Sequence, residues 1–240
     1  MKRVGIIGGI APESTVDYYR QIIALYRERS TRGSSAHVII NSIDMVKMMS
    51  MIAAARYDDV VDFLCDEIER LARAGADFAV LSSNTPHIVF GRIRDRVPIP
   101  MISIVESSAG AAASRGWKRA GLFATAFTMR AGFYADVFSK YGIAVVLPNE
   151  DEQRYLHAKY VGELVNGGYT GELVNGLFLP ETRSELARIA KRMANEDRIE
   201  ALILGGTELP LLLRGDREIE IPMLDTTAIH VERIVGEMLG

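Results

Sequence analysis

The sequence predicts an α/β protein built from two pseudo-symmetric lobes, each with a parallel-type central sheet, and with a cleft between them. Short apolar runs alternate with helix-length segments along the whole chain, which is the pattern of βαβ units with parallel strands. Several apolar runs end in glycine or in small polar residues. The second half also weakly repeats the first, because VGIIGGIAPEST at 4–15 resembles AGLFATAFTMRA at 120–131. These three observations together indicate an internal duplication.

The first half of the chain predicts alternating strands and helices. A strand at 3–7 ends at Gly8-Gly9, and a helix follows over 12–29 with Pro12 in its first turn, where the missing N–H costs nothing. Segment 58–74 carries apolar residues at the spacing of one helix face, namely Val60, Val61, Leu64, Ile68 and Leu71. The other elements expected in this half are strands at 37–43, 78–82 and 99–102, and helices at 86–93 and 105–114.

The second half predicts a similar series, which divides the chain into lobes. Its expected strands are 119–124, 143–147, 201–204 and 221–224, and its expected helices are 129–140, 150–165, 181–195, a short one after Thr207, and 226–239. GELVNG occurs at 162–167 and again at 171–176, which indicates a local duplication. We expect one lobe from 1–103 plus 211–240 and the other from 104–210, with the last helix completing the first lobe.

Composition excludes several classes of protein. The 240 residues are 48% hydrophobic and 25% charged with a net charge of −3, so no basic surface favours nucleic acid or an anionic membrane. No apolar stretch approaches a membrane span, and the first apolar run is too short for a signal peptide. The single cysteine, Cys65, excludes an intrachain disulfide and a cysteine-based metal cluster. No His, Asp and Glu spacing suggests a metal site, and we expect a cytoplasmic protein.

The polar strand ends predict where a ligand binds. In parallel sheets ligands lie beyond the carboxyl ends of the strands, and AVLSSNTPHIVF at 79–90 aligns with ALILGGTELPLLL at 201–213. Small side chains and backbone N–H groups at helix starts bind carboxylates well. The ligand expected is therefore a small carboxylate or amino acid, with Arg20 and Lys47 as available cations. The candidate binding residues are Gly9, Ile10, Ser42, Asn84, Thr85, Thr125, Thr128 and Thr207.

Three segments in the same order resemble one family. GGIAPESTVDYY at 8–19 resembles the opening Gly-Gly-Met-Gly-Pro-x-Ala/Ser-Thr, SNTPH at 83–87 resembles Cys-Asn-Thr-x-His, and GGTELPLLL at 205–213 resembles Gly-Cys-Thr-Glu-Leu. These are motifs of the aspartate/glutamate racemase family, the amino acid racemases that work without pyridoxal phosphate. The resemblance covers nearly the whole chain. It implies an isomerase with no cofactor, two lobes with the active site between them, and a homodimer.

The sequence departs from the family at the reacting groups. The resemblance implies two catalytic cysteines on opposite faces of the substrate Cα, but this chain has Ser83 and Gly206 at those positions. A thiol titrates near pKa ~8.5 and becomes a base after a modest perturbation. A serine hydroxyl needs a neighbouring base, and glycine has no side chain. Racemisation by two thiols is therefore not expected, and Cys65, beside an apolar helix stripe, is expected to be an inert core residue.

Replacement bases and alternative functions stay open at this stage. Glu208 and His87 are possible replacement bases, with Asp225 and His230 at another strand end. Each has a structural alternative: His87 packs, Glu208 complements a helix dipole, and Asp225 caps a helix. The functions to be weighed are an amino acid racemase-family enzyme, a one-base lyase, isomerase or decarboxylase of a small carboxylate, and a non-catalytic ligand-binding protein. Gly8-Gly9 lacks the third glycine of a dinucleotide fingerprint, so NAD is not expected.

Overall fold

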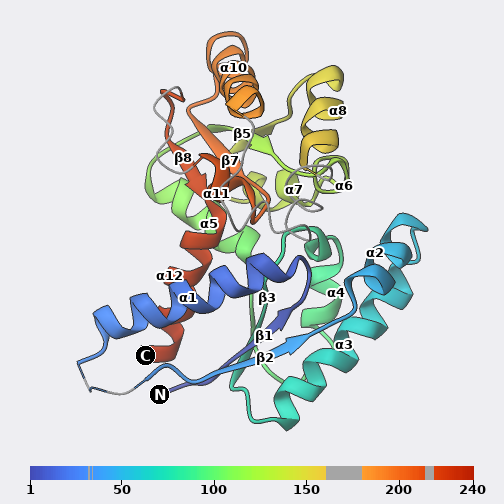
Figure 1. The fold of residues 1–240 in the computed structure, drawn as a ribbon, viewed down its shortest axis with the longest axis vertical. Coiled ribbons are helices and arrows are strands. Elements are labelled where there is room, and N and C mark those ends of the chain that lie inside the picture. Colours follow the sequence, from blue (N-terminus) through green and yellow to red (C-terminus); the bar gives the residue numbers. More distant parts are fainter. Residues whose placement is uncertain (32, 34, 161–179, 214–218) are drawn as a thin grey trace. The chain divides into compact units, whose positions relative to one another are not determined.

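The computed structural model divides the chain into two compact units, drawn in Figure 1; it describes all residues except 32, 34, 161–179 and 214–218. The first unit is Met1–Ile104 with Thr227–Gly240, and the second is Val105–Thr226. The sequence assigned residues 211–226 to the first lobe, whereas this division assigns them to the second. The reason is β8 (Met223–Asp225), which pairs in parallel with β7 (Ala201–Leu204). The GELVNG repeat and the predicted helix beyond residue 160 lie outside the described residues.

Each unit contains a four-stranded parallel sheet with the same strand order. The first sheet has the order β2-β1-β3-β4, and the second has the order β6-β5-β7-β8. The fold class predicted from the sequence, two α/β lobes with parallel sheets, is confirmed, and β1 and β3 correspond topologically to β5 and β7. The remaining strands are β1 (Val4–Gly8), β2 (Val38–Ser42), β3 (Phe78–Leu81), β4 (Met101–Ile102), β5 (Arg119–Phe123) and β6 (Ala144–Val146).

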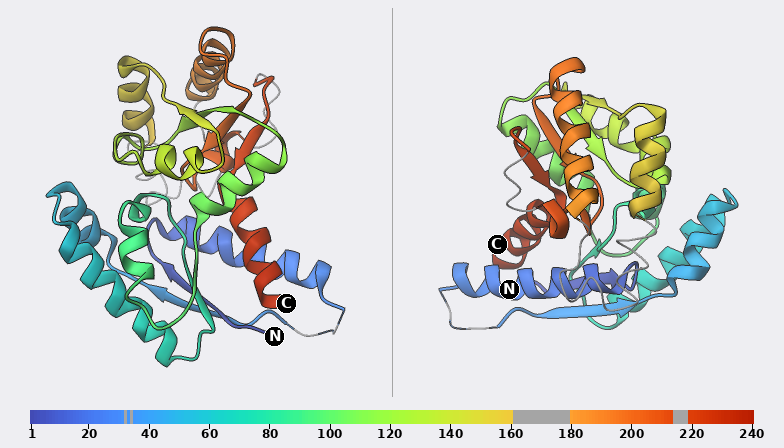
Figure 2. Two further views of the ribbon diagram at one scale, coloured as in Figure 1. Left: turned by 180° about the vertical axis from the view of Figure 1, so that it is seen from behind. Right: turned by 45° about the horizontal axis from the view of Figure 1, so that its top comes forward.

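Helices cover both faces of the first sheet, as the views in Figure 2 show. Alternate residues of β1 and β3 point to opposite faces, because side chains alternate along a strand. On one face Val4, Ile6 and Val80 pack in one cluster with α1 (Pro12–Arg29) and α12 (Thr226–Leu239). On the other face Ile7, Ala79 and Leu81 pack in a second cluster with three helices, α2 (Met45–Ala53), α3 (Tyr57–Arg73) and α4 (Phe90–Arg94). A 3₁₀ turn, η1 (Thr85–Val89), leads from β3 towards α4.

The second unit packs three helices on one face of its sheet. Phe123, Leu202 and Leu204 lie in one buried cluster with residues of α8 (Glu150–Lys159), α10 (Pro180–Glu196) and α11 (Leu209–Leu213). The other described helices of this unit are α5 (Ile104–Ser114), α6 (Ala126–Arg130) and α7 (Phe133–Ser139).

Two local predictions differ from the structure. The helix expected over 129–140 starts earlier, at Ala126, and is divided into α6 and α7, because Gly132 between them has a left-handed φ of 76°. The helix α2 was not predicted at all. Its start is marked by Asp44, whose side chain accepts a hydrogen bond from the Lys47 N–H, but its run of methionines shows no polar face that would have identified it.

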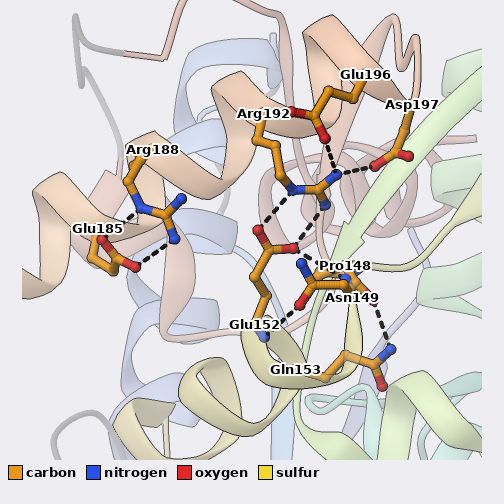
Figure 3. Close-up of polar contacts among 9 residues, drawn as sticks. All are labelled: Pro148, Asn149, Glu152, Gln153, Glu185, Arg188, Arg192, Glu196 and Asp197. Atoms are coloured by element: carbon orange, nitrogen blue, oxygen red, sulfur yellow. Dashed lines mark hydrogen bonds and ion pairs between the residues drawn. The ribbon is translucent and has the colours of Figure 1, made fainter.

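An ion pair between the buried Glu152 and the half-buried Arg192 joins α8 to α10, and Figure 3 shows its contacts. The Nε and Nη2 atoms of Arg192 donate to the two carboxylate oxygens of Glu152, both at 2.7 Å. The same carboxylate accepts a bond of 3.0 Å from the Asn149 N–H, and the Asn149 side chain accepts one from the Glu152 N–H, which forms a capping box. This arrangement holds the first turn of α8 and therefore orients the whole helix. Among the described residues, no helix is long and apolar enough to cross a membrane.

Candidate active site

The strand ends of the first unit form a tight polar turn. Gly9 follows β1 with a left-handed φ of 79°, and a Cβ there would lie 2.6 Å from the Ser42 hydroxyl oxygen and 2.8 Å from the Ile43 carbonyl oxygen. Glycine is therefore required at position 9. The Gly9 N–H donates to the Thr15 hydroxyl at 2.9 Å, and this oxygen lies 3.4 Å from the hydroxyl of Ser82. The structure thus brings the predicted residues Gly9 and Ser42 together, beside the buried Ile10.

Ser83 and Asn84 follow directly after β3 and are both nearly buried. They lead into η1, which begins at Thr85. Within the described part of the chain, no carboxylate, imidazole or amine is hydrogen-bonded to the Ser83 hydroxyl. Among the described residues, the Ser83 hydroxyl therefore has no hydrogen-bonded base of the kind that a serine needs to act in proton transfer.

His87 is engaged on both sides of its ring by backbone groups. Its Nδ1–H donates to the Ser83 carbonyl at 3.0 Å, and its Nε2 accepts from the Ile104 N–H at 3.4 Å. The ring also stacks on Phe90 with a centroid distance of 4.8 Å. Burial, with a smaller contribution from His230, lowers the pKa of His87 to about 3, so the ring is neutral. This geometry holds the turn at Ser83 and leaves neither ring nitrogen aimed at a ligand.

The other candidates of the first unit lie outside this group. His230 is fully buried between Tyr18 and the Ile102 carbonyl. Arg20 and Lys47 are exposed, and the Lys47 ammonium lies over the Phe63 ring. Cys65 is buried in the core, where burial raises the pKa of its thiol.

Thr125 and Thr128 lie together at the start of α6 in the second unit. The Thr125 hydroxyl caps the helix by accepting from the Thr128 N–H at 3.2 Å, and it donates to the Thr128 hydroxyl at 3.1 Å. Beside them, the half-buried His157 of α8 accepts from the Ala126 N–H through Nδ1 at 3.3 Å. Burial and Arg130 lower the pKa of His157, which keeps the ring neutral. Sequence analysis did not identify this histidine.

The end of β7 shows what occupies the space beside Gly206, the position at which the resemblance implies a second cysteine. A Cβ placed on Gly206 would lie 2.5 Å from Cε2, 2.6 Å from Oη and 2.8 Å from Cζ of Tyr160. The Tyr160 phenol therefore occupies the space into which a side chain at position 206 would project. The phenol donates to the Glu208 carboxylate, which also accepts from the Thr207 hydroxyl at 3.1 Å. All three side chains are buried.

Tyr160 was also missed by sequence analysis, although a weak signal exists. His157 and Tyr160 stand three residues apart at the end of α8, a spacing that places both on one helix face. Burial and the neighbouring Glu208 carboxylate raise the pKa of the Tyr160 phenol well above its usual value. The phenol therefore keeps its proton in this structure.

Three further observations concern other parts of the chain. Asp225 ends β8 immediately before α12, and the hydroxyl of the next residue, Thr226, donates to the Leu204 carbonyl at 2.8 Å. No group of three or more His, Cys, Asp or Glu side chains among the described residues could hold a metal ion.

A cavity of about 170 Å³ lies near the end of α1, lined by residues including Tyr26 and Ser30, and none of the predicted site residues lines it.

Comparison with known proteins assigns the chain to a family. Residues 7–234 match the family model described as Asp/Glu/Hydantoin racemase. The crystal structure of an aspartate racemase homologue from Pyrococcus horikoshii OT3 is 30% identical, covers 100% of both chains and superposes with a TM-score of 0.82. The chain is also 25% identical over 151 residues to the broad specificity amino-acid racemase RacX of Bacillus subtilis, and 32% identical over 109 residues to the glutamate racemase of Desulforudis audaxviator.

These curated relatives are matched only in part. The matches cover 60% and 45% of this chain, and 63% and 36% of the two relatives, so less than two thirds of either relative is spanned. The family match and the Pyrococcus horikoshii structure, in contrast, extend over nearly the whole chain and agree with the observed two-unit fold. The chain therefore belongs to the Asp/Glu/hydantoin racemase family, whose named members are isomerases.

Proposed function

We propose that this protein binds a small amino acid or dicarboxylate and transfers a proton at its Cα by one base, without a cofactor. We call Gly9, Ser42, Ser83, Asn84 and Thr85 the first strand-end set, and Thr125, Thr128, Gly206, Thr207 and Glu208 the second. We propose that these two sets supply the groups that bind the ligand. Hydroxyl groups and backbone N–H groups at helix starts are suited to carboxylates.

One observation carries the proposal that a single base acts. The chain keeps the polar strand ends, but neither Ser83 nor Gly206 offers a group that titrates near neutral pH. A two-thiol inversion needs a proton acceptor on one face of Cα and a donor on the other. Family membership and the names of the relatives support an amino acid as ligand. We further propose that the protein acts as a homodimer, as the resemblance implies.

The unmodified protein is expected to bind a panel member without inverting aspartate or glutamate. The panel consists of L- and D-aspartate, L- and D-glutamate, succinate and malate. Binding should raise the unfolding temperature, because a ligand at 100 times its Kd adds about 2.7 kcal/mol of stability. Chiral chromatography after incubation in heavy water would detect inversion. Robust inversion would contradict the one-base proposal, and the absence of binding by every panel member would contradict the proposed ligand class.

Restoring both thiols is expected to create inversion only when Tyr160 is also reduced in size. In Ser83→Cys/Gly206→Cys the new Cβ at 206 would collide with the Tyr160 ring, which the Glu208 carboxylate holds in place. Adding Tyr160→Ala removes the ring. A reacting group displaced by ~1 Å can lose about 100-fold in rate, so the triple variant should exceed the double variant by about 10- to 100-fold.

The measurement is inversion of aspartate and glutamate with deuterium uptake at Cα, followed by NMR. Two further double variants serve as controls, because each contains only one of the introduced cysteines. They are Gly206→Cys/Tyr160→Ala and Ser83→Cys/Tyr160→Ala. Equal activity of the double and triple variants would mean that the ring does not obstruct position 206. A triple variant that binds aspartate without inverting it would contradict the assignment of positions 83 and 206 to the reacting faces.

A further inference from the structure

We propose that the Tyr160 phenol, hydrogen-bonded to the Glu208 carboxylate, is the proton-transfer group that replaces the missing thiol beside Gly206. This inference rests on the proposed function and names the base that it requires. The key observation is the position of the phenol, because Cε2, Oη and Cζ of Tyr160 all lie within 2.8 Å of the point where a Cβ on Gly206 would be. The phenol therefore stands where the resemblance places a reacting side chain.

Glycine at position 206 and tyrosine at position 160 depend on each other sterically. Any side chain at 206 would displace the ring from its bond to Glu208. The neighbouring Gly205 is restricted for a different reason, since a Cβ there would lie 2.6 Å from the Leu122 side chain and 3.2 Å from the Phe123 carbonyl oxygen. The absence of a side chain at 206 is thus linked to the presence of a buried phenol hydroxyl, held by Glu208, at the same place.

The hydrogen bonds around the phenol define the direction of proton transfer. Tyr160 donates its proton to Glu208, whose carboxylate is also held by the Thr207 hydroxyl at 3.1 Å. The phenol oxygen also accepts from the Glu208 N–H, and because the Thr207 hydroxyl donates to the carboxylate, one lone pair of the phenol remains to accept from the ligand. All three residues belong to the same unit and follow β7 or end α8. Glu208 is itself buried and its carboxylate is bonded to the phenol, so the carboxylate acts through the phenol.

The proposed step balances without any co-reactant. The Cα–H bond of the ligand breaks, its proton binds to the phenol oxygen of Tyr160, and the phenol's own proton moves along the existing hydrogen bond to Glu208. The electron pair of the broken bond stays on the ligand and is delocalised into its carboxylate. The reverse movement returns a proton to the same face of Cα. In heavy water this cycle exchanges the α-hydrogen for deuterium with retention of configuration.

The first test compares Tyr160→Phe with the unmodified protein on the panel defined above. Exchange at Cα with retention is expected for at least one amino acid that binds. Because general acid–base groups contribute about 10²- to 10⁴-fold, Tyr160→Phe should lower the exchange rate at saturation at least about 100-fold. Its affinity for the same panel member should change less than about 3-fold, since the ring remains in place.

Glu208→Gln separates the positioning role of the carboxylate from a structural one. Glutamine keeps the shape and accepts the phenol's hydrogen bond, but it does not take up the proton. The maximal exchange rate should therefore fall at least about 100-fold with little change in KM. A merely structural role would change folding stability and KM instead.

Tyr134→Phe is the matched control. Tyr134 is another buried tyrosine of the same unit, hydrogen-bonded to Thr226, so it reports the effect of removing a buried phenol oxygen elsewhere. Its exchange rate should equal that of the unmodified protein. Exchange that survives Tyr160→Phe would overturn the inference, as would binding of an amino acid without any exchange, and both results would leave ligand binding intact. Failure of every panel member to bind would overturn the proposed function itself, and this inference with it.

Discussion

Replacing Arg192 with alanine is expected to lower the free energy of unfolding by about 3 to 5 kcal/mol, because it leaves a buried carboxylate without its cation. Arg192 makes two bonds of 2.7 Å to Glu152 and a third of 2.8 Å to Asp197. The Glu152 side chain is only 6% exposed, and that of Arg192 is 18% exposed. After the substitution, the Glu152 carboxylate keeps the Asn149 N–H but loses both charged donors. Urea unfolding followed by circular dichroism would measure the loss.

Arg188→Ala is the matched control on the same helix. Arg188 also makes a two-bond pair with Glu185, at 2.8 and 2.7 Å, which is drawn in Figure 3. Their side chains are 58% and 34% exposed. Exposed pairs are worth at most about 1 kcal/mol, so this change should cost little. Equal losses for Arg192→Ala and Arg188→Ala would contradict the argument from burial. Replacing both Glu152 and Arg192 with leucine should recover much of the loss, because no unpaired charge remains.

Acid is expected to destabilise the first unit below pH 6.5 through two buried histidines. Burial lowers the pKa of His87 to about 3 and that of His230 to about 4. In the unfolded chain both titrate near 6.5, so the unfolded state binds protons first. Their contribution to stability is therefore complete above pH 6.5 and is lost as the pH falls towards 4 and 3. At pH 5 the expected loss is on the order of 2 kcal/mol for each histidine.

The measurement is the free energy of unfolding between pH 7.5 and pH 5, with hydrogen exchange to locate the opening in the first unit. His87→Gln and His230→Gln should each reduce the slope of stability against pH by about half over this range. His37 is exposed, and His37→Gln should leave the slope unchanged. A flat profile between pH 7 and pH 5 would show that neither ring stays neutral when buried. Glutamine variants with an unchanged slope would assign the protons to other groups.

Much of the fold followed from the order of residues along the chain. Apolar runs such as Phe78–Leu81 and Ala201–Leu204 are short, continuous and bounded by helix-length segments, and both form buried parallel strands. The similarity between the two halves was visible because both sheets have the same strand order, with small or polar residues after several strands. α2 was not predicted, because its segment is rich in methionine. One side of the helix is buried, but the few polar residues on the other side do not show a clear helical periodicity in the sequence.

The candidate site was also predictable from the sequence only in part. Ser83, Thr125, Gly206 and Glu208 follow predicted strands directly, so a local pattern was sufficient to select them. Tyr160 is separated from Gly206 by more than forty positions, and no local pattern relates them. Their relation exists only because α8 packs against the end of β7 and places the phenol where glycine leaves room.

The sequence by itself determined the α/β class, the repeated unit, the family resemblance and the absence of both thiols, since each depends on residue identity and local spacing. Only the tertiary structure decided what surrounds those positions. It showed that both nitrogens of His87 are used by backbone groups, that Glu152 is buried with Arg192, and that Tyr160 fills the space beside Gly206. The physical reason is that burial and hydrogen-bond partners are set by packing between distant segments, and these set the charge and the reach of each group.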